Sequence, residues 1–236
     1  MIAITQSLAV WYFTRGSGAL SLILLTIVFA LGTPTLLSWG HAHLPRAVVL
    51  LLHRNLSLLV MVFLFLHIAS TVIDGFAPIG WLDAIVPFRA GYRPLWLGLG
   101  AVAVDLLVAV IITSLMRVRI GYATWRWVHL LTYAMWPIAM LHGLGTGSDT
   151  RSPWMWWVDG ACAAVVLVAV GWRLKVWRPV DPRLRTMAVG ALVVVPLLVV
   201  GWVMIGPMKK NWSKRAASAD TTVVQVIGRR DEVGGS

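Results

Sequence analysis

Histidines carry the most specific pattern in this chain of 236 residues. His53 and His67 stand fourteen residues apart in one apolar segment, and His129 and His142 stand thirteen apart in another. In an α-helix of about 3.6 residues per turn, fourteen residues place two side chains on nearly one face, roughly 21 Å apart along the axis. The second spacing gives a matching rise of roughly 20 Å. The four rings could therefore meet as two pairs at two depths.

Pro137 lies between the second pair of histidines. In a straight helix, a spacing of thirteen residues would turn His142 well away from the face that carries His129. An internal proline removes a backbone hydrogen bond and bends the helix. We expect this bend to bring both rings toward the helix that carries His53 and His67.

Paired imidazoles at matched depth predict iron ligands. His53 with His129 would hold one b-type haem, and His67 with His142 would hold a second one; a single haem stays open as an alternative. Two axial histidines leave no open position on the iron, so the expected chemistry is electron transfer rather than oxygen binding. A lone membrane histidine is often an interhelical hydrogen bond, but two pairs of matched rise favour metal ligands.

The remaining histidines and the cysteine are weaker signals. His41 and His43 form an HxH pair in a short loop, and we interpret both as loop residues. Cys162 is the only cysteine, which excludes an intrachain disulfide and a cysteine-ligated iron–sulfur cluster.

Six apolar segments could position these residues. A helix needs roughly 20 apolar residues to cross a bilayer core, and the segments that qualify are approximately 17–37, 47–73, 95–116, 125–144, 154–176 and 187–205. The prediction is an all-α, polytopic membrane bundle of about six transmembrane helices, with haem between the second and the fourth. We expect one domain over 1–206 and a polar tail over 207–236 that is disordered or depends on a partner.

The composition supports a membrane protein. Only 12% of the residues are charged, against about 25% in soluble domains, and the mean hydropathy is +0.82. Lipid is therefore the expected solvent, and a multi-pass position in the cell (inner) membrane is the expected location. The net charge of +11 does not indicate nucleic acid, because the basic residues cluster between apolar segments as the positive-inside rule describes.

Orientation follows from the distribution of Lys and Arg. The loops after the first, third and fifth segments, with the adjoining helix ends, hold ten cationic residues: Arg46, Arg54, Arg117, Arg119, Arg126, Arg173, Lys175, Arg178, Arg183 and Arg185. The loops after the second and fourth hold three: Arg89, Arg93 and Arg151. This places both termini outside the cytoplasm, although the tail cluster of Lys209, Lys210, Lys214 and Arg215 favours the opposite orientation.

Other polar residues lie near the predicted ligands. Arg54 and Arg126 stand within one turn of His53 and His129, and a guanidinium matches the carboxylate of a haem propionate. Weaker candidates for the same role at the other haem are Arg89, Arg93 and Arg151. The alternative for Arg54 and Arg126 is ordinary positive-inside charge.

An acidic residue and four glycines complete the candidates. Asp105 falls in the middle of the third segment, where a carboxyl could accept a proton from a quinol, bind a histidine Nδ1–H, or simply form a hydrogen bond across the bundle. Small residues that would allow close approach of a helix or a porphyrin are Gly16, Gly18, Gly98 and Gly100.

Two stretches resemble the ferric reductase-like transmembrane superfamily. The first is His53-Arg54-Asn55-Leu56-Ser57 through Leu66-His67-Ile68; the second comprises Thr113-Ser114, Arg117, Arg119, Gly121, Trp125-Arg126, His129-Leu130, Tyr133 and Leu141-His142. That superfamily includes NADPH oxidases, ferric reductases and the YedZ/MsrQ-type haem membrane subunits. The resemblance, over roughly residues 15 to 175, implies four helices around stacked b-haems and electron flow across the membrane.

The sequence also indicates what the partners should be. It has no GxGxxG motif after a strand and no soluble segment long enough for a nicotinamide domain. We therefore expect an oxidoreductase component with a separate donor, either a quinol or a flavoprotein, and a separate extracytoplasmic acceptor protein; a bound flavin or quinone stays open. One alternative is a terminal reductase of ferric chelates or oxygen, and another is a non-haem transporter or structural membrane subunit.

Overall fold

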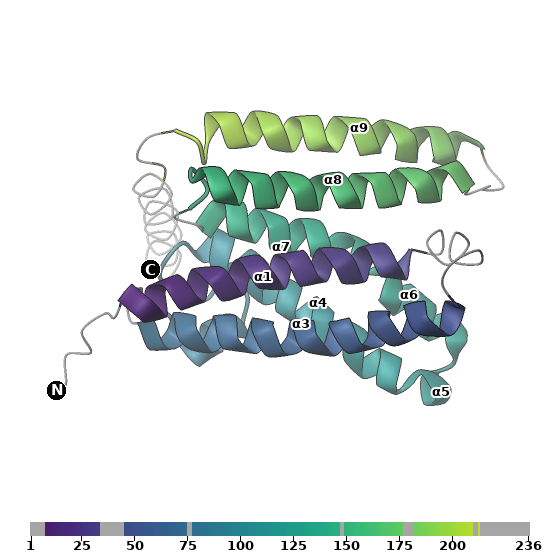
Figure 1. Cartoon of the computed structure of the whole chain (residues 1–236), viewed down its shortest axis with the longest axis horizontal. Coiled ribbons are helices and arrows are strands. Elements are labelled where there is room, and N and C mark those ends of the chain that lie inside the picture. The colour runs from purple at the N-terminus through teal and green to yellow at the C-terminus, as the bar shows by residue number, and fades with distance from the viewer. Residues whose placement is uncertain are drawn as a thin grey trace, which may run out of the picture. The chain divides into compact units, whose positions relative to one another are not determined.

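A computed structural model describes residues 8–33, 45–74, 77–146, 149–176, 182–209 and 212. Every regular element within these ranges is a helix, which confirms the predicted all-α class (Figure 1). The elements are α1 Leu8–Gly32, α3 Arg46–Asp74, the 3-10 helix η1 Trp81–Ala84, α4 Pro94–Leu115, α5 Arg117–Ile120, α6 Tyr122–Leu130, α7 Thr132–Thr146, α8 Pro153–Val176 and α9 Pro182–Ile205.

Five of the described helices are long and apolar enough to cross a bilayer: α1, α3, α4, α8 and α9. Many of their large apolar side chains are exposed, such as Leu58 and Phe65 on α3 and Val193 and Leu197 on α9. Exposure of this kind is expected where lipid is the solvent. The chain is therefore a multi-pass membrane protein.

The predicted fourth segment is not one continuous helix. It is interrupted at Leu131, between α6 and α7, although the backbone of Leu131 keeps right-handed helical angles (φ −62°, ψ −17°). Leu131 donates its N–H to Val128 O at 3.0 Å, the tighter three-residue bond. Pro137 follows inside α7 and cannot donate to the Tyr133 carbonyl, which weakens the next turn as well.

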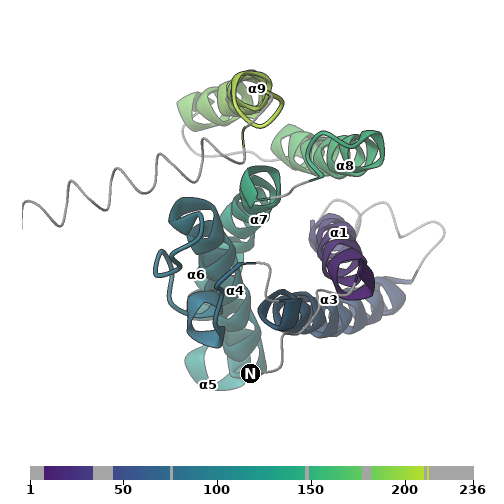
Figure 2. The same cartoon turned by 90° about the vertical axis from the view of Figure 1, so that its left-hand side faces the viewer.

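The described residues group into two compact units. The first contains α1, α3, α8 and most of α9, and α1 packs against both α3 and α8 (Figures 1 and 2). Small polar side chains on α1 are buried, and they bind carbonyls of their own helix: Ser21 Oγ donates to Ser17 O and Thr26 Oγ1 to Leu22 O, both at 2.8 Å. Satisfied hydroxyls of this size permit close packing without an unpaired polar group.

The second unit is built on α4. Helices α6 and α7 pack against it (Figure 2), and so does η1. Pro94 occupies the first turn of α4, where its missing N–H costs nothing. Close contacts at two glycines join the elements, because a Cβ at Gly98 would collide with Phe88 and one at Gly145 would collide with Trp96.

Several predicted features fall outside the described residues. These are the loop with His41 and His43, the cations Arg178, Lys210, Lys214 and Arg215, and most of the tail over 207–236. The proposed boundary of a single domain at 206 stays a prediction.

Candidate functional site

His67 on α3 has a fixed orientation against α1. Its Nδ1 lies 2.9 Å from the carbonyl oxygen of Thr14. A carbonyl can only accept, so Nδ1 carries the proton and Nε2 keeps the lone pair. The ring lies over Gly18, where an added Cβ would be 2.9 Å from Cε1 of His67, closer than side chains tolerate.

His53, nearer the start of α3, repeats this arrangement with the other end of α1. Its Nδ1 lies 3.1 Å from Val28 O. The ring faces Gly32, where a Cβ would lie 3.1 Å from Cε1 of His53. Both histidines of α3 are therefore held by α1 through a backbone carbonyl and a glycine.

His142 on α7 shows the same arrangement against α4. Its Nδ1 lies 2.8 Å from Trp96 O, and a Cβ on Gly100 would lie 2.6 Å from both Cε1 and Nδ1 of the ring. The orientation again puts the proton on Nδ1 and the lone pair on Nε2. The prediction that Gly18 and Gly100 allow close approach is thus confirmed, with a histidine ring as the group that approaches. Gly16 faces open space, and Gly98 accommodates Phe88.

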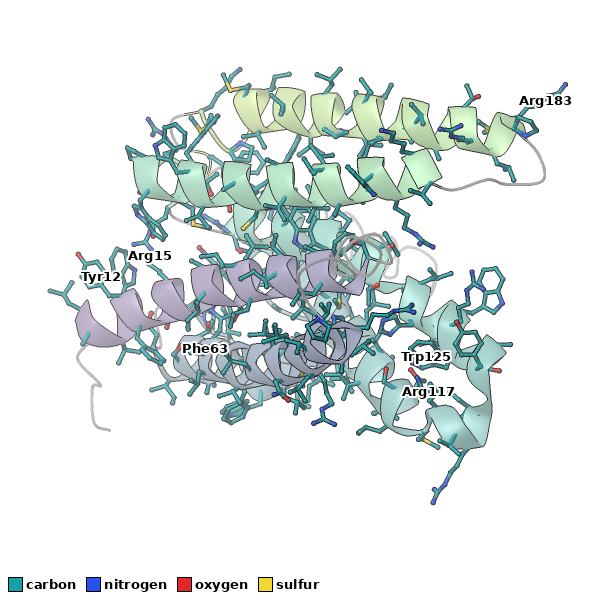
Figure 3. The ribbon with its side chains drawn as sticks, turned by 45° about the vertical axis from the view of Figure 1, so that its right-hand side comes forward. Tyr12, Arg15, Phe63, Arg117, Trp125 and Arg183 are labelled. Atoms are coloured by element: carbon teal, nitrogen blue, oxygen red, sulfur yellow. The ribbon has the colours of Figure 1, made fainter. Side chains whose placement is uncertain are left out.

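His129 on α6 has different surroundings. Its ring lies 4.9 Å from that of Trp125, measured between centroids and tilted by 30°. Trp125 donates from Nε1 to Ser114 Oγ at 3.1 Å, and the guanidinium of Arg117 lies over its ring at 5.4 Å (Figure 3). The end of α4 and the short helix α5 therefore position Trp125, and Trp125 stacks on the histidine.

A hydroxyl group binds the backbone carbonyl of each of the four histidines. The pairs are Ser57 Oγ to His53 O at 2.6 Å, Thr71 Oγ1 to His67 O at 2.7 Å, Thr132 Oγ1 to His129 O at 2.8 Å, and Thr146 Oγ1 to His142 O at 2.6 Å. Hydrogen bonds of this kind bend or tighten a helix locally. The sequence carries this signal as Ser or Thr three or four residues after each histidine, and it was not used in the prediction.

The structure distinguishes the candidate cations. Arg54 and Arg126 are exposed, so their guanidinium groups are available to a ligand at the helix surface. Arg89 is exposed and lies 4.0 Å from Asp83, so its guanidinium faces a carboxylate of its own loop. Arg93 is buried, with 3% of its surface exposed, and donates from Nη1 to Gly145 O and Thr146 O at the end of α7.

The acidic candidates need one correction. Asp105 is exposed on α4, and the Nδ1 partners of His53, His67 and His142 are backbone carbonyls. The suggestion that Asp105 binds an Nδ1–H is therefore wrong for these three, because each ring lies directly on a glycine of the neighbouring helix.

Sequence reasoning missed Asp159 in α8, which has 9% of its surface exposed and lies near the thiol of Cys162. It lies in an apolar segment just as Asp105 does. The rule that marked Asp105, a carboxylate inside a membrane segment, could have marked it too.

Comparison with known proteins identifies the family. A model described as "Ferric reductase like transmembrane component" matches residues 16–140, which is more than half of the chain. The matched stretch contains His53, His67 and His129 and ends just before His142. No curated protein and no solved structure matches. The chain therefore belongs to the ferric reductase-like transmembrane family.

Proposed function

We propose that this protein carries electrons across the cell (inner) membrane through two b-type haems, one held by His53 and His129 and the other by His67 and His142. The donor would be a separate quinol or flavoprotein, and the acceptor a separate extracytoplasmic protein. Membership of the family supports a membrane electron-transfer role and a haem cofactor. The ligand pairs, the number of haems and the partners belong to the proposal.

The repeated orientation of three histidines carries this proposal. In His53, His67 and His142 the Nδ1–H is donated to a backbone carbonyl, and this tautomer carries its lone pair on Nε2, as a histidine that binds iron through Nε2 would. Metal-binding histidines typically donate their second nitrogen in this way, because the bond fixes the tautomer and the direction of the ring. If these histidines served only to join helices, one hydrogen bond from Nδ1–H to a carbonyl in one place would be enough. Three bonds of the same kind are more than that role needs.

The residues present also fit a flat cofactor beside the rings. When bound, haem supplies reversible one-electron chemistry at its iron. The chain contributes the orientation of each ring, a glycine that lets the ring lie against the neighbouring helix, and exposed guanidinium groups at Arg54 and Arg126 for the cofactor carboxylates.

The absorption spectrum of the full chain, purified in detergent from cells supplied with haem, tests this function. We expect a low-spin spectrum that sharpens on reduction, and a pyridine haemochrome assay that gives about two haems per chain. A folded preparation with no haem would overturn the proposal in favour of a transporter or a structural subunit. A high-spin spectrum that changes when carbon monoxide binds would overturn the paired histidine ligands.

A further inference from the structure

Arg93 stands at a strained position. It caps the start of α4 with φ 45° and ψ 58°, in the left-handed region, directly before Pro94. This conformation costs free energy for any residue with a Cβ, and glycine would adopt it freely. The backbone alone gives no reason for an arginine here, so the reason lies in what its side chain binds.

The side chain joins the start of α4 to the end of α7. Its Nη1 donates to Gly145 O at 3.3 Å and to Thr146 O at 3.0 Å. These carbonyls lie in the last turn of α7, where carbonyl oxygens have no N–H donor within the helix and attract positive charge. The ring of Tyr92 covers the guanidinium at 5.1 Å. The guanidinium is thus held in one orientation.

One side of this buried cation is unsatisfied. Nε of Arg93 is buried and has no hydrogen-bond acceptor among the residues that the structure describes. Within the same residues Arg93 forms no ion pair, and Asp83 of the preceding loop pairs with Arg89. A buried charge with an unpaired donor is costly in an apolar setting unless an anion meets it. The geometry calls for an oxygen acceptor at Nε.

The same contacts place Arg93 within one turn of His142. Its acceptors are three and four residues beyond His142, and Thr146 also binds His142 O through its hydroxyl. Trp96, three residues after Arg93, supplies the carbonyl that orients the His142 ring. The cation and the imidazole therefore share the scaffold formed by the start of α4 and the end of α7.

We propose that Arg93 binds an oxyanion, and that this anion is a carboxylate of the porphyrin held by His142. The identity of the anion rests on the proposed function. A guanidinium donates to a carboxylate in a planar, directional manner. A fixed positive charge beside the His142 site also stabilises the reduced form there, because reduction adds a negative charge. Arg93 therefore makes this site easier to reduce than it would be without the cation.

The experiment is a potentiometric titration of the full chain, followed by its visible absorbance. Arg93→Gly removes the side chain and relieves the backbone strain, Arg93→Lys keeps the charge without Nε–H, and Arg89→Gly is the control from the same loop. We expect Arg93→Gly to lower the midpoint of only the transition that His142→Ala abolishes. Arg93→Lys should lower it less, and Arg89→Gly should change neither midpoint. Unchanged midpoints in Arg93→Gly, or equal shifts of both, would overturn the proposal.

A second arm identifies the carboxylate. The haem-free chain is reconstituted with haem or with its dimethyl ester, which has no free carboxylate. The ester should bind the His142 site less tightly than haem does in the wild type, and this difference in affinity should nearly vanish in Arg93→Gly, because both changes remove the same interaction. Additive effects would mean that Arg93 does not contact the porphyrin.

A third arm separates this inference from the proposed function. If the wild type never binds haem, the proposed function fails, and thermal unfolding of the haem-free chain is followed with added inorganic phosphate. Stabilisation of the wild type but not of Arg93→Gly would support an oxyanion site for a free anion. Equal responses would overturn the site itself.

Discussion

At the scale of single residues, the three histidines with carbonyl partners follow one rule. The carbonyl comes from residue 14, 28 or 96, and the glycine beneath the ring is residue 18, 32 or 100, four positions later. In an α-helix the carbonyl of residue i accepts the N–H of residue i+4, which here is the glycine itself. The missing side chain lets the imidazole reach that carbonyl and use its second lone pair.

Gly100→Ala should therefore disturb His142 specifically. The added Cβ would lie 2.6 Å from the ring, and overpacking of this kind costs about 1–3 kcal/mol. We expect loss of the haem that His142→Ala removes, together with a lower midpoint of thermal unfolding. Gly143→Ala is the control, because a Cβ there meets nothing within 4 Å. Full haem content in Gly100→Ala would mean that the ring is not held against α4.

The ligand pairs make a separate prediction. His67→Ala and His142→Ala should remove one and the same haem, and His53→Ala and His129→Ala should remove the other. The reason is the rise of roughly 20 Å between the two histidines of each predicted segment, which puts them at two different depths. Redox titration of each variant measures this. If His53→Ala and His142→Ala abolished one common transition and spared the other, the pairing would be wrong.

At the scale of elements, long apolar segments were predictable and their interruptions were not. The segments predicted at 47–73, 95–116 and 154–176 lie within a residue of Arg46–Asp74, Pro94–Leu115 and Pro153–Val176, because the bilayer sets their length. The break at Leu131 has no such signal, since leucine is apolar and its backbone stays helical.

The first helix shows another limit. It begins at Leu8 rather than near residue 17, because Arg15 does not end the apolar segment. Its guanidinium lies over the Trp11 ring at 3.6 Å, one turn back on the same helix. Tyr12 and Arg15 can be followed near the start of α1 in Figure 3. A cation covered in this way can lie at a membrane boundary.

The candidate site likewise has a part that the sequence indicates and a part that it does not. Spacing along one segment indicated the histidines, since His53 and His67 lie on one predicted segment and His129 and His142 on another. The carbonyl partners and the burial of Arg93 depend on which helix lies alongside, and the sequence has no direct signal for that.

Pro137→Ala tests how the helix around His129 and His142 is shaped. With the N–H to Tyr133 O restored, the stretch should straighten and turn His142 away from the direction of His129. We expect unchanged or higher helix content by circular dichroism, with loss of at least one haem. Pro196→Ala, inside α9, is the matched control and should keep both. Two haems in Pro137→Ala would show that the proline does not set the ligand geometry.

At the scale of the whole molecule, the distribution of charge predicts how the chain is inserted. Cations lie at the end of α8 and the start of α9, where Arg185 Nε donates to Leu174 O at 3.2 Å and Arg183 extends from the first turn (Figure 3). Arg46 begins α3, and Arg117 and Arg119 form α5. With α6 and α7 counted together as the predicted fourth span, alternation of successive spans would put these ends on one side, and the positive-inside rule predicts that this side is the cytoplasm.

A reporter fused after Ser236 measures the insertion. Alkaline phosphatase should be active there and a cytoplasmic fluorescent protein dark, because both termini are expected outside. The same reporters placed after Val176 should give the opposite result and serve as the control. Reversed activities would invert the membrane orientation and move the acceptor into the cytoplasm, while the proposed ligands would stand.

A backbone carbonyl takes up no proton near neutral pH, and this sets His53, His67 and His142 apart from histidines held by carboxylates. Where a carboxylate accepts the histidine Nδ1–H, a change in the oxidation state of the bound metal can be accompanied by movement of the proton along this hydrogen bond. With the oxygens of Val28, Thr14 and Trp96 as acceptors, the proton would stay on Nδ1 in both oxidation states of a bound haem. These three hydrogen bonds would then add no pH dependence to the midpoint potential of a haem that the histidines hold.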